Sequence, residues 1–207
     1  MLNCGYLPLI DPAAFPNLGL MRQISGILDA ELHYFILRSG GDSNFEEYQK
    51  TLQNILDLQQ EMDFHIIIHR HLDLATGPAV LGVHLTQNSS PLRQARQSMT
   101  PEQILGYSAH SLDEALKAEQ AGANYLLVGA VFPTPKKTAD HPILGTTELK
   151  RICRAVKIPV FAIGGITAEN LIQIKDAEAY GFSALRAVFG DGNIEHNIRK
   201  LNLLWDL

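Results

Sequence analysis

Cysteine is scarce in this sequence, and long apolar runs are missing from it. The chain has two cysteines, Cys4 and Cys153, in 207 residues, which is too few for a disulfide framework. No apolar run approaches the roughly 20 residues of a membrane-spanning helix. The first residues also lack the basic, apolar and small-residue pattern of a secretory leader. We therefore expect a cytoplasmic protein.

Basic side chains are outnumbered by acidic ones, 17 against 22, which gives a formal net charge of −5. Broad binding to nucleic acid or to a membrane surface normally shows as a basic stripe or a basic amphipathic helix. We expect neither nucleic acid nor a membrane as a partner. The expected partner is a small-molecule substrate, and a homodimer is a possible assembly. In so acidic a protein, any bound anion must be held by a few local groups.

The length and the apolar content suit one sizeable core. Hydrophobic residues make up 46% of the chain, and no linker or low-complexity tract divides it. We expect one domain over residues 1–207.

Short apolar runs alternate with helical patterns along almost the whole chain, as in βα units. Capping signals mark several helix starts, such as Ser43 with Glu46 and Ser111 with Glu114. The predicted strands are Cys4 to Ile10, Leu32 to Leu37, Phe64 to Ile68, Leu81 to Leu85, Leu105 to Ser108, Tyr125 to Phe132, Val160 to Ile163 and Ser183 to Val188. Eight apolar strands, each followed by a helix, predict an α/β protein with a (β/α)8 TIM barrel. An open doubly wound sheet is the alternative, but no early G-x-G-x-x-G motif supports it.

The C-terminal ends of the strands form the active face of such a barrel. Polar residues and glycines stand at these ends: Arg38, His69, His71, His84, Asn88, Ser108, His110, Thr134, Lys136, Lys137, Gly164, Gly165 and Arg186. Packing does not explain polar side chains at so many independent strand ends. We expect the site there.

Gly164 and Gly165 stand where a predicted strand stops, and Thr167 can cap the next helix. Amides freed by two glycines, together with the positive end of a helix, make a place for a phosphate. Many barrels hold a phosphate after strands seven and eight, where Arg186 can add charge. The alternative is a tight turn without a ligand.

Three histidines follow neighbouring strands. His69 and His71 have an H-x-H spacing, which on an extended chain points both imidazoles the same way, as in some metal sites. His84 is the best third ligand, but no Cys, Asp or Glu completes the set, so no metal site is expected. An acid/base or hydrogen-bonding role for one imidazole is favoured, because imidazole titrates near neutral pH.

Arg38 precedes a Ser-Gly-Gly loop, and Lys136 and Lys137 follow the strand that begins at Tyr125. Arg offers bidentate donors to phosphate and Lys offers a compact charge, so these residues can form an anion clamp. A surface salt bridge for Arg38 and a solvated loop for the lysines are the alternatives.

Three segments resemble the thiamine phosphate synthase and TenI family: GVHLTQ at 82–87, YSAHSLDEALKAEQAGANYLLVGAVFPTPKK at 107–137, and IPVFAIGGITAEN at 158–170. The resemblance covers nearly the whole chain, and its middle block is long and specific. It implies a small (β/α)8 barrel, a site for thiazole phosphate and a place in thiamine biosynthesis.

The resemblance also implies residue roles. Gly164 and Gly165 look like the thiazole-phosphate amides, aided by Leu185, Arg186 and Ala187. Ser108, Thr134 and Lys137 match positions around the pyrimidine diphosphate, and Arg38 matches the first member of an Arg-x-Lys pair whose lysine is replaced by Gly40. The other substrate-binding residues that we expect are Lys136, His71 and Asn88.

The chain departs from the synthase pattern at the metal positions. The resemblance implies that synthases have Asn-Asp-Asp after strand three and an acidic pair after strand four, which hold Mg²⁺. In this chain the matching positions are His69-Arg70-His71 and Asn88-Ser89. Mg²⁺ prefers carboxylate and phosphate oxygens. We expect no cofactor, and Mg²⁺ only if the protein acts as a synthase.

The TenI branch aromatises a thiazole carboxylate phosphate by a metal-free proton transfer that uses a His. That His follows the glycine of strand six, where this chain has Ala130. Our first choice as its replacement is His69, and His84 is second. We expect a TenI-like thiazole tautomerase; the alternatives are a thiamine phosphate synthase and a non-catalytic thiazole-phosphate-binding protein. The candidate catalytic residues are His69, His84, Arg38 and Lys137.

Overall fold

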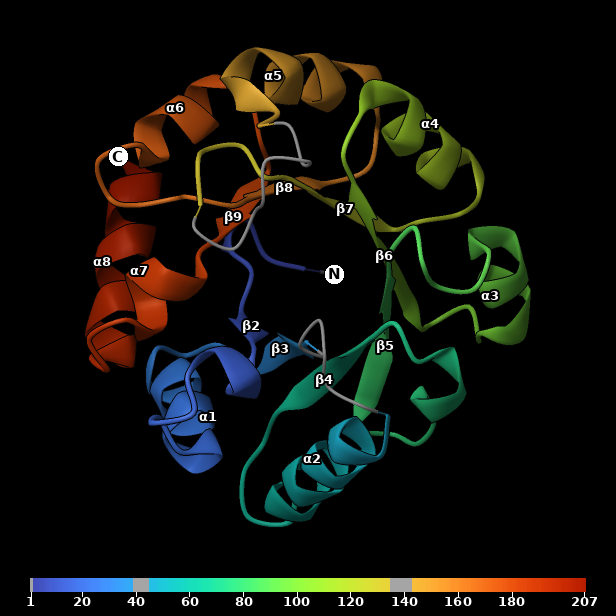
Figure 1. The fold of residues 1–207 in the computed structure, drawn as a ribbon, viewed down its shortest axis with the longest axis vertical. Coiled ribbons are helices and arrows are strands. Elements are labelled where there is room, and N and C mark those ends of the chain that lie inside the picture. Colours follow the sequence, from blue (N-terminus) through green and yellow to red (C-terminus); the bar gives the residue numbers. More distant parts are fainter. Residues whose placement is uncertain (1, 39–44, 135–142) are drawn as a thin grey trace.

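The computed structural model describes residues 2–38, 45–134 and 143–207. Parallel strand segments form one sheet in the order β1-β9-β8-β7-β6-β5-β4-β3-β2, and helices surround it (Figure 1). The strands are β1 (Gly5–Tyr6), β2 (Leu9–Ile10), β3 (Tyr34–Leu37), β4 (His65–His69), β5 (Val80–Leu85), β6 (Ile104–Ala109), β7 (Tyr125–Gly129), β8 (Val160–Ile163) and β9 (Gly181–Ser183). The helices are η1 (Pro12–Ala14), α1 (Leu20–Asp29), α2 (Phe45–Leu58), η2 (Leu72–Leu74), α3 (Leu92–Ser98), α4 (Leu112–Gln120), α5 (Gly145–Ala155), α6 (Leu171–Asp176), α7 (Leu185–Phe189) and α8 (Ile194–Asp206).

The sheet closes through residues 5–10, which form one barrel strand in two halves. β1 pairs with β9, and β2 pairs with β3. Between the halves, the Leu7 amide donates to the Phe182 carbonyl at 2.8 Å, and the Pro8 carbonyl accepts from the Ile36 amide at 2.9 Å. Pro8 has no N–H to continue the ladder, which accounts for the interruption. The nine segments therefore make eight barrel strands, and the predicted TIM-barrel fold is confirmed.

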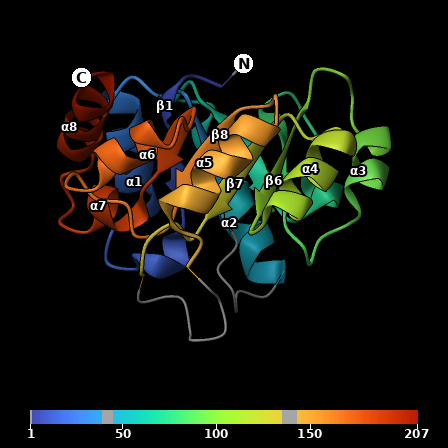
Figure 2. The ribbon, with the colours of Figure 1, turned by 90° about the horizontal axis from the view of Figure 1, so that it is seen from above.

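Alternate residues of each strand face the barrel interior or the surrounding helices. The interior cluster is Leu2, Leu7, Leu9, Ile36, Ile67, Tyr125, Leu127 and Phe161. The outer face of the sheet packs under the helices, which form a layer around it (Figure 2). Each fully buried Leu or Ile contributes roughly 1.5–3 kcal/mol, so these two layers hold the barrel together. None of the helices in the described part of the chain is long and apolar enough to cross a membrane.

A glycine makes room for the largest polar side chain of the interior. A Cβ atom on Gly106 would lie 2.2 Å from the ring of Tyr125. With glycine there, the buried Tyr125 ring crosses the interior and its hydroxyl reaches His84, 2.9 Å away. The hydrogen bond between Tyr125 and His84 therefore links the apolar interior to the barrel mouth.

Three local predictions need correction. The last strand ends at Ser183, and α7 begins at Leu185, because Leu185, Val188 and Phe189 have helical spacing. The strand from Tyr125 ends at Gly129 rather than Phe132. Thr167 does not cap α6: Asn170 directly precedes the helix and makes no side-chain hydrogen bond to it, and its side-chain oxygen accepts instead from the Thr167 amide.

The cap at Ser111 is confirmed. The Ser111 hydroxyl accepts from the Glu114 amide, and the Glu114 carboxylate accepts from the His110 amide. The predicted cap at Ser43 lies outside the described residues.

Candidate active site

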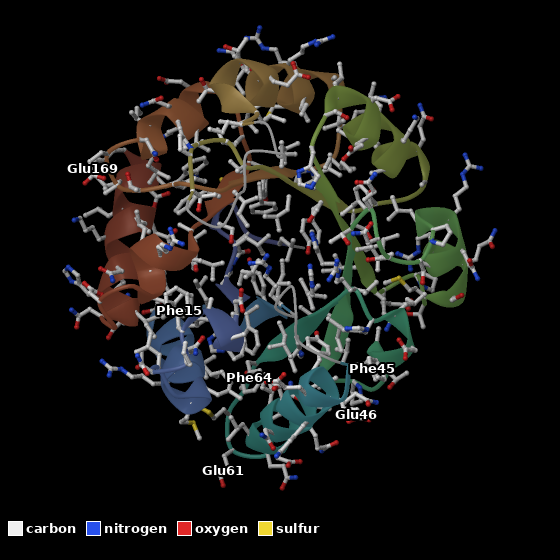
Figure 3. The ribbon with its side chains drawn as sticks, viewed as in Figure 1. Phe15, Phe45, Glu46, Glu61, Phe64 and Glu169 are labelled. Carbon is white, nitrogen blue, oxygen red and sulfur yellow. The ribbon has the colours of Figure 1, made fainter. Side chains whose placement is uncertain are left out.

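The C-terminal ends of the parallel strands meet at one mouth of the barrel. Seen down the barrel, side chains fill the ring of strands (Figure 3). Arg38, directly after β3, forms an ion pair with Asp11 at 3.1 Å. Asp11 is fully buried after β2 and also accepts from the Ala14 amide at the start of η1. The charge of Arg38 is therefore partly balanced by a carboxylate that was not among the predicted site residues. Asp11 was identifiable, since it directly follows the apolar Leu9–Ile10 pair.

His84 lies at the centre of a buried hydrogen-bonded chain. Its Nδ1 atom is 2.9 Å from the Tyr125 hydroxyl, and its Nε2 atom is 2.8 Å from the Ser108 hydroxyl. Burial lowers the pKa of His84 to about 3, so its imidazole is neutral at physiological pH. Both ring nitrogens already have protein partners. His84 is therefore suited to positioning Ser108 rather than to exchanging a proton with a ligand.

His69 stacks beside His84, with ring centroids 6.0 Å apart and an interplanar angle of 11°. Burial lowers the pKa of His69 well below its ordinary value, and His84, Arg38 and Arg70 lower it further. Its backbone amide donates to the Tyr48 hydroxyl at 3.1 Å. His69 and His84, the two predicted acid/base residues, do lie together. Both rings are neutral, and the positively charged Arg38 and Arg70 lie near them.

His71 does not share the direction of His69, contrary to the expectation from the H-x-H spacing. β4 ends at His69, and Arg70 adopts a left-handed backbone conformation with φ of 72°. The His71 ring instead packs at 4.8 Å from Tyr48 and 5.0 Å from Phe45 on α2 (Phe45 is labelled in Figure 3). The positive φ ends the alternation of an extended strand, which is why the spacing misled.

A cleft of about 800 Å³ opens beside the mouth, between the segments that follow β4 and β5. Arg70, His71, Asn88 and Ser89 line it. The Ser89 hydroxyl accepts from the Thr86 amide at 3.0 Å, which fixes the turn after β5. The cleft brings together Arg70 and His71 with Asn88 and Ser89, the residues that stand at the metal-binding positions of the synthase pattern.

Gly164 and Gly165 form a rigid turn after β8. Their φ values are 97° and 67°, and added Cβ atoms would lie 2.5 Å from the Ala130 Cβ and 2.5 Å from the Pro133 carbonyl oxygen. The Gly164 carbonyl accepts from the Phe132 amide, and the Gly165 carbonyl accepts from the Asn170 side chain. Across the described ranges, nothing accepts a hydrogen bond from either glycine N–H. The carbonyl groups of Gly164 and Gly165 thus fix the turn, and their two N–H groups can donate to an anion.

Ser183, at the end of β9, was not identified from the sequence. It pairs in register with Ile163, one residue before Gly164. Its side chain is 1% exposed, and its hydroxyl has no hydrogen-bond partner in the described structure. No sequence signal singles out this serine, because its isolation depends on how the neighbouring strands pack.

The other expected residues are more dispersed. Leu185, Arg186 and Ala187 lie on α7 instead of a strand; Arg186 is exposed, while Leu185 packs against the interior cluster. The His110 ring contacts the Gly129 carbonyl in the turn before α4. Thr134 is half-buried at the end of a described range. Lys136 and Lys137 lie outside the described residues.

Known proteins match this chain over most of its length. The family model described as thiamine monophosphate synthase matches residues 7–188. A thiamine-phosphate synthase of Syntrophomonas wolfei is 37% identical over 169 residues, which are 82% of this chain and 79% of that protein. One from Pyrococcus abyssi is 36% identical over 160 residues, 77% of this chain and 76% of that protein.

A solved structure has the same architecture. The thiamine phosphate pyrophosphorylase from Pyrococcus furiosus has a TM-score of 0.81 at 27% sequence identity, covering 98% of this chain and 96% of that one. The chain therefore belongs to the thiamine monophosphate synthase family, whose members are enzymes of thiamine biosynthesis with a TIM-barrel-like fold.

Proposed function

We propose that this protein is a thiamine-phosphate synthase, which joins a pyrimidine diphosphate to thiazole phosphate and releases diphosphate. The observation that carries the proposal is the presence, at the barrel mouth, of two sets of hydrogen-bond donors that can each hold an anion. One set is the N–H groups of Gly164 and Gly165 after β8; the other is Arg38 and Arg70 after β3 and β4. In the strand order, β8 and β4 lie four positions apart, across an eight-strand barrel. Two anionic substrates can thus be held facing each other.

Each set suits one substrate. Amides in a glycine turn bind a phosphate without a side chain, which favours thiazole phosphate at Gly164 and Gly165. The guanidinium groups of Arg38 and Arg70 suit the more highly charged diphosphate. Ser108, held by His84 at 2.8 Å, lies between them on β6 and can orient the pyrimidine. Holding both reactants in this way supplies the proximity that a two-substrate reaction needs.

The residues present do not fit a Mg²⁺ site. Residues 69–71 at the end of β4 and 88–89 after β5 offer imidazole, guanidinium, amide and hydroxyl groups, whereas Mg²⁺ prefers carboxylates and phosphate oxygens. Asp73 is the one carboxylate among the described residues that line the cleft beside them. Within the described ranges, no group of three or more His, Cys, Asp or Glu residues could hold a metal ion. The proposed reaction therefore has no step that uses a protein-bound metal.

The tautomerase reading, which the sequence placed first, is less well supported than the synthase. Relatives sharing 36–37% identity are named thiamine-phosphate synthases. The two histidines chosen as acid/base are buried with lowered pKa values, and both nitrogens of His84 are engaged by Tyr125 and Ser108. A base with so low a pKa removes protons poorly at neutral pH.

The test is to incubate the purified protein with pyrimidine diphosphate and thiazole phosphate and to measure thiamine phosphate and released diphosphate. We expect equal amounts of both products. A parallel assay supplies the non-aromatic thiazole carboxylate phosphate alone. Aromatisation there, without condensation in the first assay, would favour the tautomerase instead; tight binding without either reaction would favour a binding protein.

A further inference from the structure

Arg70 occupies an unusual backbone position at the edge of the site. Its φ of 72° lies in the left-handed region, which residues other than glycine rarely adopt. Its amide donates to the His84 carbonyl at 2.9 Å, so the neighbouring strand holds the conformation in place. Such strained positions cluster at functional sites, where they direct a side chain to a place that an ordinary strand would not reach.

Among the described residues, the guanidinium of Arg70 has no ion-pair partner. No carboxylate in the described part of the chain lies within ion-pair distance of it. Within the described ranges its side chain makes one hydrogen bond, from Nε to the Thr86 hydroxyl, which is long at 3.5 Å. Arg38, by contrast, is paired with the buried Asp11. Arg70 therefore keeps its full charge for a ligand.

The cleft beside Arg70 is lined with groups that can contact a polyphosphate. It measures about 800 Å³, and Asn88, Ser89, Ser90 and Gln103 line it together with Arg70. Amides and hydroxyls of these residues can donate to phosphate oxygens. Asp73, exposed on η2, is the one acidic side chain among the described residues that line the cleft.

We propose that Arg70 takes the part of a divalent cation in this protein, binding the diphosphate in the cleft through its guanidinium. This inference rests on the proposed synthase function. In the reaction, the bond between the pyrimidine-bearing carbon and the diphosphate oxygen breaks as a bond from that carbon to the thiazole nitrogen forms. The electron pair of the broken bond leaves with the diphosphate, and Arg70 stabilises the negative charge that develops.

A guanidinium is suited to this role. It stays protonated at any physiological pH and presents paired donors that match two phosphate oxygens. Burial is the main cause of the lowered pKa of His69, and the charges of Arg38 and Arg70 lower it further, which places both guanidinium groups near this side of the mouth. A fixed charge of this kind needs no metal to stabilise a leaving group.

The experiment is calorimetric titration with inorganic pyrophosphate in the presence of EDTA. The main variant is Arg70→Gly, because glycine accepts a φ of 72° without strain and removes only the side chain. We expect the unchanged protein to bind pyrophosphate and Arg70→Gly to bind it roughly 10- to 100-fold more weakly, the loss expected for charged hydrogen bonds. Arg70→Gln should show the same loss. The control Arg93→Gln, on the exposed surface of α3, should bind within about twofold of the unchanged protein.

Asp73→Asn separates the two ways of binding a diphosphate. If Arg70 holds the anion directly, removing this acid leaves binding unchanged or tighter. Binding that requires added Mg²⁺, disappears in Asp73→Asn and is unaffected in Arg70→Gly would overturn the inference. Thiamine phosphate formation that is indifferent to Arg70→Gly would also overturn it while leaving the synthase function intact. Metal-free pyrophosphate binding through Arg70 without any condensation would support the anion site and refute the synthase.

Discussion

The Nε2 atom of His84 lies 2.8 Å from the Oγ atom of Ser108, and the opposite ring nitrogen is 2.9 Å from the Tyr125 hydroxyl. A buried neutral imidazole therefore links a tyrosine of the barrel interior to a serine of the mouth. Because Gly106 makes room for the Tyr125 ring, the position of Ser108 depends on the packing of a glycine two residues before it on β6. The chain of contacts gives His84 a positioning role in the proposed reaction.

We expect His84→Gln and Ser108→Ala to act through the same contact. If His84 works by holding Ser108, each change should lower kcat/KM for the pyrimidine diphosphate by roughly 10-fold, and the double variant should lose little more. Initial rates for the four proteins complete the cycle. Effects that multiply in the double variant would show that His84 and Ser108 act independently. Thermal unfolding of each variant checks that the fold is kept.

The barrel was predictable because its signals are local and repeated. Apolar strands such as Ile66–Ile68 and Val160–Ile163 alternate with amphipathic helices, and the glycine pair after β8 marks a turn in the sequence itself. The Ser111 cap was equally readable, since its partner Glu114 lies three residues away. Each of these features depends on residues that are close to one another in the sequence.

The errors arose where distant packing decides. The apolar run from Ala184 fits a strand by its composition and a helix by its spacing, and it forms α7 because pairing with β8 ends at Ser183. The direction of His71 depends on the backbone conformation of Arg70, which sequence spacing does not reveal. The burial of Asp11 and the isolated hydroxyl of Ser183 arise only when strands far apart in the chain are brought together.

Stability should fall as the pH drops below neutrality. The pKa of His84 is about 3 in the folded protein, against an ordinary value of about 6.5 in the unfolded chain, so the unfolded state binds more protons in between. The stabilisation is complete above pH 6.5 and is lost as the pH falls toward 3. One such histidine gives a slope of at most about 1.4 kcal/mol per pH unit, and His69 adds to it in the same direction.

Urea unfolding at several pH values from 7 to 5 measures this slope. His84→Gln should make the unfolding free energy less dependent on pH, whereas His65→Gln, at an exposed position, should leave the slope unchanged. A slope that is the same in His84→Gln as in the unchanged protein would contradict a buried neutral imidazole.

Gly164→Ala should impair both the turn and the binding of thiazole phosphate. The new Cβ atom would lie 2.5 Å from that of Ala130, at a φ of 97°, so the turn must shift and its amides with it. We expect a loss of more than about 1 kcal/mol in unfolding free energy and at least roughly 10-fold weaker binding of thiazole phosphate. Gly77→Ala is the matched control: its φ is 90°, but nothing lies within 4 Å of the added atom. That variant should lose stability from backbone strain and keep its affinity, both measured by calorimetry.

Ser183→Ala should change stability and binding in opposite directions. The hydroxyl is buried without a partner in the described structure, so removing it relieves a desolvation cost and should keep or raise the unfolding free energy, by up to about 1 kcal/mol. If this hydroxyl meets the phosphate or ring of a ligand anchored at Gly164, the same change should weaken binding of thiazole phosphate roughly 3- to 10-fold. Ser25→Ala, on α1 away from the strand ends, should alter affinity by less than about twofold. Equal affinity in Ser183→Ala and the unchanged protein would show that the buried hydroxyl does not contact the ligand.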